Sequence, residues 1–405
     1  MLRSVRQRHA TELAAQHKQN EVLLTGSDTN ATTTSPSSRC RKSLLFVLLS
    51  TLALVVSYGG ETLRDIGTVM FIHTNIHLMQ PDLTNVNIEP LPQRIANLDP
   101  ANKFSFVHIS KCAGTTWIRL FKKILKLNIC PREESGTEQS VSYHQQYTCK
   151  DADYTLISLR SPRHHVWSQF TMCKYSAWGK RATKNKSFPR SGDKYEDDEV
   201  DFDSWLAHFA VNNTHYYNCY HPANFQTRAL TSQRRYVGSG RGGFDPNMTL
   251  AMNTYNSLDF VALVEFVHES QCMIYYRLGD KAPPAATSYL SNTCHCEKQH
   301  ENKGHKKNGA VHVQHHSMAK RSNLRDLPPA TLSKLAKLTS ADSFIYVNAL
   351  KHFMDEMAWL ESDDALGRRV VCDDVLKKWE PELAYLDSGR FNVTQMYKDA
   401  VTKLK

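Results

Sequence analysis

The sequence predicts an α/β fold in which a P-loop-type parallel sheet is flanked by helices and preceded by one N-terminal transmembrane helix. Short apolar runs at 104–107, 154–159 and 260–264 are typical of strands that a parallel sheet buries on both faces. Stretches with helical spacing of apolar residues follow the first two runs. A longer uncharged apolar segment, 43–58, precedes all of them.

The first strand leads into the segment 108–117, HISKCAGTTW, which opens an amphipathic helix. A strand, a loop of small residues and a helix together form an anion-binding site from backbone N–H groups. An ATP-type P-loop has its lysine after the last glycine, next to a Ser or Thr that holds Mg²⁺. Here Lys111 comes before Gly114, and no first glycine is present. The loop therefore suits a phosphate-bearing donor that is used without a metal.

The helix after this loop also carries a group of basic residues, Arg119, Lys122, Lys123 and Lys126. By default such residues form a solvated surface; the alternative is that they hold an acidic substrate.

The second strand, 154–159, runs directly into Arg160-Ser161-Pro162-Arg163, where the proline ends it, and a helical pattern resumes at 165–175. The stretches 179–201 and 291–326 are charged and read as loop insertions. The second contains Cys294, Cys296 and many histidines, but its spacing fits no zinc site, so we expect disulfides and no metal.

The N-terminal quarter divides into a cytosolic tail (1–42), a transmembrane signal anchor (43–60) and a luminal stem (61–101), followed by a catalytic domain (102–405). Basic residues flank the apolar segment on its N-terminal side, which predicts a single-pass type II topology. A buried core helix is the alternative for this segment. A cleaved signal peptide is disfavoured by the long polar leader.

The chain has 10 cysteines and a formal net charge of +10. Most cysteines, and the N-x-[ST] acceptors at Asn185, Asn212, Asn247 and Asn392, follow the apolar segment, as expected in an oxidising lumen. The charge indicates an anionic partner. Because no nucleic-acid-binding motif is present, an acidic glycan is favoured over nucleic acid.

Taken together, several motifs resemble the Golgi carbohydrate sulfotransferases, and heparan sulfate 6-O-sulfotransferases most closely. The loop is similar to their 5′-phosphosulfate-binding loop, and Arg160-Ser161-Pro162-Arg163 with Ser168 is similar to their 3′-phosphate-binding motif. Further similar stretches are 224–230, 262–266 and 342–353, so the resemblance spans roughly residues 104–355 in the family's order.

The resemblance implies the sulfotransferase fold and 3′-phosphoadenylyl sulfate (PAPS) as co-substrate, with a hydroxyl of a glycan as acceptor. The predicted donor-binding residues are Lys111, Cys112, Ala113, Gly114, Thr115, Thr116, Arg160 and Ser168. Backbone N–H groups of the loop would hold the 5′-phosphate, and Lys111 would neutralise the leaving oxygen. Arg160 and Ser168 would contact the 3′-phosphate.

An acceptor hydroxyl also needs a general base, and the 6-O enzymes carry a histidine between their two cofactor motifs. His144 is the only histidine between Thr116 and Arg160, so it is the predicted base. His164 and His165 are its rivals, whereas His108 is expected to pack at the strand end.

The sequence departs from the family pattern at Ser161, which replaces an Asp, and at His165, which replaces the second arginine of the motif. The two charged insertions, 179–201 and 291–326, suggest a divergent member. Its acceptor is then a glycosaminoglycan such as heparan sulfate, or a chondroitin/dermatan-type or other carbohydrate. An ATP-dependent kinase is disfavoured by the missing Lys-Ser/Thr pair. A catalytically inactive membrane protein that binds acidic glycans remains the alternative from another class. The expected location is the Golgi membrane, with oligomeric state open.

Overall fold

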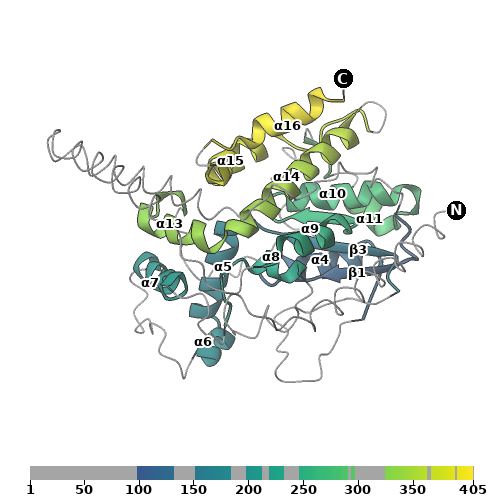
Figure 1. The fold of residues 1–405 in the computed structure, drawn as a ribbon. Coiled ribbons are helices and arrows are strands. Elements are labelled where there is room, and N and C mark those ends of the chain that lie inside the picture. Colours follow the sequence, from purple (N-terminus) through teal and green to yellow (C-terminus); the bar gives the residue numbers. More distant parts are fainter. Residues whose placement is uncertain are drawn as a thin grey trace, which may run out of the picture. The chain divides into compact units, whose positions relative to one another are not determined.

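The computed structural model describes residues 98–131, 151–183, 198–211, 219–231, 246–290, 293–296, 324–362, 366–387 and 390–404 (Figure 1). These residues all belong to the unit Ile72–Lys405 of the chain. The strands are β1 (Lys103–Val107), β2 (Asn128–Ile129), β3 (Tyr154–Leu159) and β4 (Phe260–Leu263). The helices are α4 (Gly114–Arg119), η1 (Leu120–Ile124), α5 (Pro162–Tyr175), α6 (Ala177–Thr183), α7 (Asp198–Val211), α8 (Phe225–Leu230), α9 (Met248–Asn256), α10 (Val267–Leu278), η2 (Gly279–Lys281), α11 (Pro284–Leu290), η4 (Leu324–Asp326), α13 (Pro329–Leu338), α14 (Ser340–Glu361), α15 (Asp373–Leu383), η5 (Ala384–Asp387) and α16 (Val393–Thr402).

The strands form one parallel sheet in the order β2-β1-β3-β4. Phe104 and Phe106 of β1 and Leu156 and Ile157 of β3 are almost completely buried, as expected for the centre of a parallel sheet. Helices flank the sheet: α10 and α14 pack against β4, and the Trp117 indole of α4 donates a hydrogen bond of 3.0 Å to the Ser158 hydroxyl of β3. The predicted α/β fold with a parallel sheet is therefore confirmed.

Some element boundaries differ from the prediction. Helix α5 begins at Pro162 rather than at 165, because proline has no N–H to lose in the first turn of a helix. The helix after the first loop changes to a π-helix in η1, where Leu125 N–H bonds to Leu120 O at 2.9 Å.

The two predicted insertions are partly ordered in helices. Helix α6 extends to Thr183 and α7 begins at Asp198, so both ends of the stretch 179–201 are helical rather than loop. In the stretch 291–326 the structure describes 293–296 and the 3₁₀ helix η4. The remainder of both stretches lies outside the described residues.

Disulfides link distant parts of the fold. Cys173 pairs with Cys219, Cys272 with Cys294, and Cys296 with Cys372, and Cys130 is also disulfide-bonded. The two cysteines of Cys294-x-Cys296 thus belong to different bridges, and the expectation of disulfides in this stretch is confirmed. Cys112 is buried and is the only free cysteine among the residues that the structure describes.

Two of the predicted glycosylation acceptors are exposed N-caps. The Asn247 side chain accepts a hydrogen bond from Leu250 N–H at the start of α9, and Asn392 accepts one from Gln395 N–H at the start of α16. Asn185 and Asn212 lie outside the described residues.

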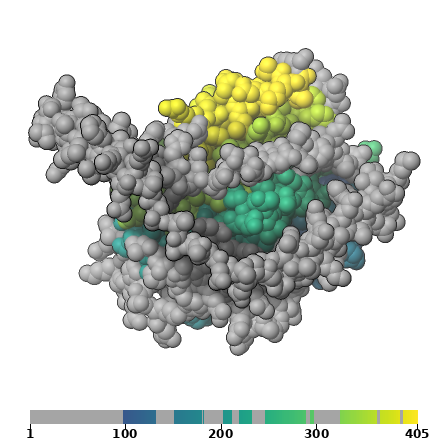
Figure 2. All heavy atoms as spheres, viewed as in Figure 1, coloured from purple at the N-terminus to yellow at the C-terminus, as the bar shows by residue number. Residues whose placement is uncertain are grey.

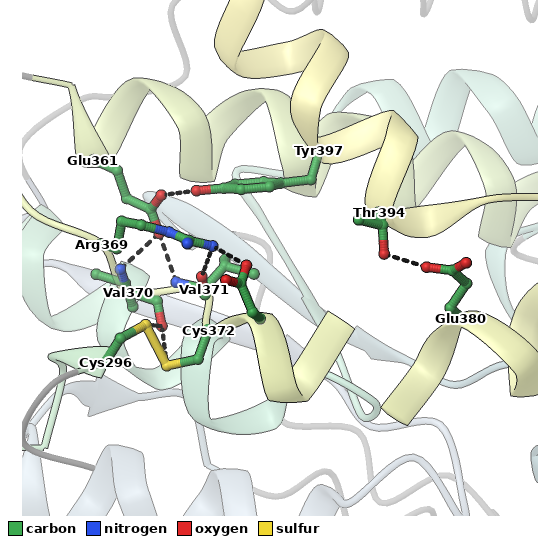
Figure 3. A network of polar contacts seen from close by, with 10 residues as sticks. Cys296, Glu361, Arg369, Val370, Val371, Cys372, Glu380, Thr394 and Tyr397 are labelled. Carbon is green, nitrogen blue, oxygen red and sulfur yellow. Dashed lines mark hydrogen bonds and ion pairs between the residues drawn. A yellow bond between two sulfur atoms is a disulfide. The ribbon is translucent and has the colours of Figure 1, made fainter. Parts of the chain in front are cut away.

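The C-terminal helices α15 and α16 lie beside α14 and form one continuous surface with it in the space-filling view (Figure 2, yellow and yellow-green). A polar network holds them (Figure 3). The Glu361 carboxylate at the end of α14 accepts hydrogen bonds from Val370 N–H at 2.7 Å, Val371 N–H at 2.6 Å and the Tyr397 hydroxyl. The Cys296–Cys372 disulfide lies in the same network, which we call the C-terminal brace.

Among the described residues, no helix has both the length and the hydropathy required to span a membrane. The predicted tail (1–42), anchor (43–60) and most of the predicted stem (61–101) lie outside them.

Candidate functional site

The loop after β1 and the loop after β3 meet at the carboxyl-terminal edge of the sheet. Their strands are direct parallel neighbours, and the Arg160 guanidinium donates a hydrogen bond of 3.2 Å from Nη1 to the backbone oxygen of Lys111. The chain moves from β1 to β2 on one side and then to β3 on the other, so the strand order reverses between β1 and β3. Open α/β sheets bind ligands at this kind of position.

The backbone of the first loop is held in a tight, partly left-handed path. Lys111 has φ 71° and Ala113 has φ 58°, a region that residues other than glycine rarely adopt. The ring of His108 packs so closely on Gly114 that a Cβ there would lie 1.8 Å from it. His108 therefore packs at the strand end as predicted, and only glycine can start α4 at position 114.

Lys111 is a half-buried cation whose positive neighbour is Arg160. Burial, and secondarily the positive charge of Arg160, lower the pKa of Lys111 from its ordinary 10.5 to about 8. Within the described part of the chain, the ammonium group makes no ion pair with a carboxylate. An anion bound beside Lys111 would stabilise its charged form against burial and the repulsion of Arg160.

The other loop residues are divided between the core and the surface. Cys112 is fully buried and its thiol lies 3.5 Å from the Gln226 side-chain oxygen, so only the backbone of Cys112 is in a position to contact a ligand. Burial raises the pKa of this thiol. Thr115 is exposed at the start of α4, whereas Thr116 is buried. Thr115 is thus the loop hydroxyl that faces solvent.

Gln226, at the start of α8, fixes the backbone of Arg160. Its side-chain oxygen accepts a hydrogen bond from Arg160 N–H at 2.8 Å, and its amide donates one of 2.7 Å to Arg160 O. The same oxygen accepts a hydrogen bond from the Cys112 thiol, so the buried Gln226 side chain bridges both loops. This contact positions the two candidate donor-binding segments relative to each other.

Glu265, just after β4, holds the next residue of the second loop. Its carboxylate accepts hydrogen bonds from Ser161 N–H at 3.1 Å and from the Tyr346 hydroxyl of α14 at 2.8 Å. Burial, followed by the charge of Glu265, raises the pKa of Tyr346, so this tyrosine remains a neutral donor. The Ser161 hydroxyl in turn lies 2.8 Å from His164 Nδ1.

Hydrogen bonds link helix α14 to helix α8 and its N-cap Asn224, and they support the contacts of Gln226 described above. The Asp342 carboxylate accepts hydrogen bonds from Thr227 N–H at 2.8 Å, the Thr227 hydroxyl at 2.7 Å and Gln226 N–H at 3.3 Å. In return, the Asn224 side chain accepts one from Ala341 N–H at 3.0 Å. Burial raises the pKa of Asp342 to about 6, opposed by the hydrogen bonds from Thr227. The further stretches of the resemblance thus meet as a support for the two loops.

The predicted 3′-phosphate residues and the rival histidines lie on α5. Ser168 is partly buried, three residues after His165 and therefore near it on the helix surface. His165 is fully buried and its Nε2 lies 2.8 Å from Ser110 O, so it supports the first loop. His164 contacts Ser161 and, through Nε2 at 3.5 Å, the Glu382 carboxylate. Both histidines are thus engaged in structural contacts, and the predicted base His144 lies outside the described residues.

The C-terminal helices also reach this edge. The Arg163 guanidinium lies 3.8 Å from the centre of the Tyr385 ring, and Arg163 N–H donates a hydrogen bond of 3.2 Å to the Tyr385 hydroxyl. Burial raises the pKa of this hydroxyl. Glu382 contacts His164 and pairs with Arg325 Nε at 3.1 Å. The start of α5 is therefore clamped by α15 and η5.

Sequence reasoning assigned no role to these supporting residues. Gln226, Glu265 and Asp342 stand in stretches that the resemblance had marked, and a buried polar residue amid apolar ones was the available signal. Glu382 and Tyr385 follow the last matching stretch, and their local sequence carries no motif.

One group among the described residues has the composition of a metal site: His268, Cys272 and Cys294. Because Cys272 and Cys294 form a disulfide with each other, neither sulfur is a thiolate that could bind a cation.

Comparison with known proteins gave no match to a family model, to a curated protein or to a solved structure.

Proposed function

We propose that this chain is a sulfotransferase that transfers a sulfuryl group from PAPS to a hydroxyl of a glycan. The observation that carries the proposal is the pair Lys111 and Arg160, two cations side by side at the switch point of the sheet. Burial and the neighbouring charge of Arg160 lower the pKa of Lys111, so a bound anion would stabilise its charged form, and a nucleotide with phosphate groups at both ends supplies one.

The roles follow from the positions of the residues. Backbone N–H groups at the start of α4 and the exposed Thr115 hydroxyl would hold the 5′-phosphate, and Arg160 with Ser168 the 3′-phosphate. Lys111 would neutralise the phosphate oxygen that leaves sulfur. The acceptor oxygen forms a bond to sulfur while the bond from sulfur to the 5′-phosphate oxygen breaks. The hydroxyl proton passes to a base, for which we propose His144, and 3′-phosphoadenosine 5′-phosphate is released.

The net charge of +10 favours an anionic acceptor such as heparan sulfate or a chondroitin/dermatan-type chain. The disulfides support a luminal catalytic domain, because such bridges persist in oxidising compartments. A type II protein of the Golgi membrane, with residues 43–60 as its anchor, fits both the anionic acceptor and the disulfide-bonded catalytic domain. The retained Lys111, Arg160 and Ser168 argue against the inactive glycan-binding alternative.

The test has two parts. Calorimetric titration with 3′-phosphoadenosine 5′-phosphate should show binding to the purified full-length protein, and failure to bind would overturn the enzyme proposal. Radiolabelled sulfate transfer from PAPS to a panel of glycosaminoglycans, followed by disaccharide analysis, then identifies the acceptor.

The base is tested with His144→Ala. This variant should lose turnover but keep nucleotide binding, because a general base acts on the acceptor and not on the donor. Undiminished transfer by His144→Ala would assign the base to another residue. Binding without transfer by the unaltered protein to any acceptor of the panel would favour the inactive alternative.

A further inference from the structure

The helix that begins at the candidate site exposes Thr115 in its first turn, and its other exposed residues up to Lys126 are all cations. Arg119, Lys122, Lys123 and Lys126 are all exposed, and we call these four residues the basic strip. From 108 to 132 the sequence contains no Asp or Glu. The strip is therefore a local concentration of positive charge rather than a mixed, self-neutralised surface.

Three of the four cations of the strip make no ion pair within the fold that the structure describes. Arg119, Lys123 and Lys126 take part in no hydrogen bond or ion pair there, whereas Lys281 and Lys334 pair with Asp99 and Asp203 at 2.7 Å. Lys126 also has φ 52° at the end of the helix, a conformation in which glycine is usual.

The opposite side of the same helix fixes the orientation of the strip. Leu120, Phe121 and Leu125 are buried in the core, and the π-helical turn of η1 lies at these residues. The cations are therefore held away from the core on a rigid element. A rise of about 1.5 Å per residue places Arg119 roughly 8 Å from Gly114 along α4, and the strip continues from there to Lys126.

The chemistry of the surroundings favours one occupant. The aromatic residues of the helix, Trp117 and Phe121, are buried, so no exposed ring is available to stack on a nucleic-acid base. The apolar residues Leu120 and Leu125 are buried as well, and the partly buried Ile118 and Ile124 pack against the core, so none of them protrudes as a membrane-inserting side chain does. The occupant that fits these observations is a polyanion recognised by its charge alone. The acidic glycan that the proposed function takes as acceptor is such a polyanion.

We propose that the basic strip binds the anionic polysaccharide segment that flanks the acceptor sugar. This inference rests on the proposed function and extends it from the transfer site to the polymer. Each carboxylate or sulfate held on the strip releases condensed counterions, so the interaction is sensitive to salt. A polymer bound along the strip would leave one end at the loop where sulfur is transferred.

The test compares two triple variants of the full-length protein with equal change of charge. Arg119→Gln/Lys123→Gln/Lys126→Gln removes the strip, and Lys337→Gln/Lys351→Gln/Lys398→Gln removes three exposed lysines elsewhere. Heparin affinity at about 0.1 M salt should fall roughly tenfold or more in the strip variant, with a shallower salt dependence, and change little in the control. The KM for polymeric acceptor should rise in parallel.

Binding of 3′-phosphoadenosine 5′-phosphate should be unchanged in both variants, which separates this inference from the donor site. Equal loss of heparin affinity in both variants would overturn it, because net charge would then explain the effect. So would a strip variant that keeps heparin affinity but loses binding to phosphatidylserine vesicles, since the strip would then be a membrane contact. If heparin binding depends on the strip but 3′-phosphoadenosine 5′-phosphate does not bind, the strip remains a polyanion-binding surface and the sulfotransferase proposal fails.

Discussion

The candidate site and the C-terminal brace treat buried charge in opposite ways. In the brace, the partly buried Glu361 carboxylate is surrounded by hydrogen-bond donors (Figure 3). At the site, Lys111 lies near a second cation and no described carboxylate pairs with it. In the brace, donors from within the chain oppose the effect of burial, which still raises the pKa of Glu361. At the site, burial and the charge of Arg160 both disfavour the charged form of Lys111, which a bound anion would stabilise.

The largest effect is expected at Lys111. Replacement by alanine removes the charge that stabilises the leaving oxygen, so the kcat of sulfate transfer should fall by about 10²–10³-fold. The measurement is single-turnover transfer from PAPS, and Lys337→Ala is a matched exposed-lysine control that should keep full activity. If Lys111→Ala retained the wild-type rate of transfer, Lys111 would be one more surface cation. The contrast between the candidate site and the brace would then no longer hold.

The next effect is on pH dependence. The pKa of Lys111 is lowered to about 8, and the anion binds the protonated form, so affinity is full below this pH and is lost as pH rises through it. The dissociation constant of 3′-phosphoadenosine 5′-phosphate should rise about tenfold per pH unit above the pKa. Titration from neutral to alkaline pH measures it. In Lys111→Arg the dependence should flatten, since arginine stays charged; an unchanged slope in that variant would assign the titration to another group.

The smallest effect is expected in the brace. Tyr397→Phe removes one hydrogen bond to Glu361 but leaves the two from backbone N–H groups, so the free energy of unfolding should fall by about 1 kcal/mol. Thermal unfolding measures this, and kcat should not change. A raised KM for PAPS in Tyr397→Phe would instead show that a change in the brace alters the position of α5 through Glu382 and Tyr385. The brace and the candidate site would then be coupled, and the contrast between them would weaken.

Much of the fold could be predicted because its signals are local. The strand at 154–159 follows from its own apolar residues, and the helix after Arg160 follows from a proline that can occupy a first turn. The position of the two loops also follows, since parallel neighbouring strands end at the same edge of a sheet.

The support of the site could not be predicted in the same way. Gln226 is 66 residues from Arg160, Glu265 is 104 from Ser161 and Tyr385 is 222 from Arg163, and nothing in the local sequence specifies such partners. The disulfide partners were equally open, because pairing depends on which Cα atoms the fold brings within reach.

The sequence by itself determined the α/β class, the three longer strands but not β2, the loop with its lysine before the glycine, and the order of the motifs. These depend on the period of apolar residues and on the conformational limits of glycine and proline, which act over a few residues. Only the tertiary structure decided that Lys111 and Arg160 are neighbours, that His164 and His165 serve as supports, and that the C-terminal helices clamp α5. The physical reason is that charge pairing and burial are set by distances in space, which separation along the chain does not fix.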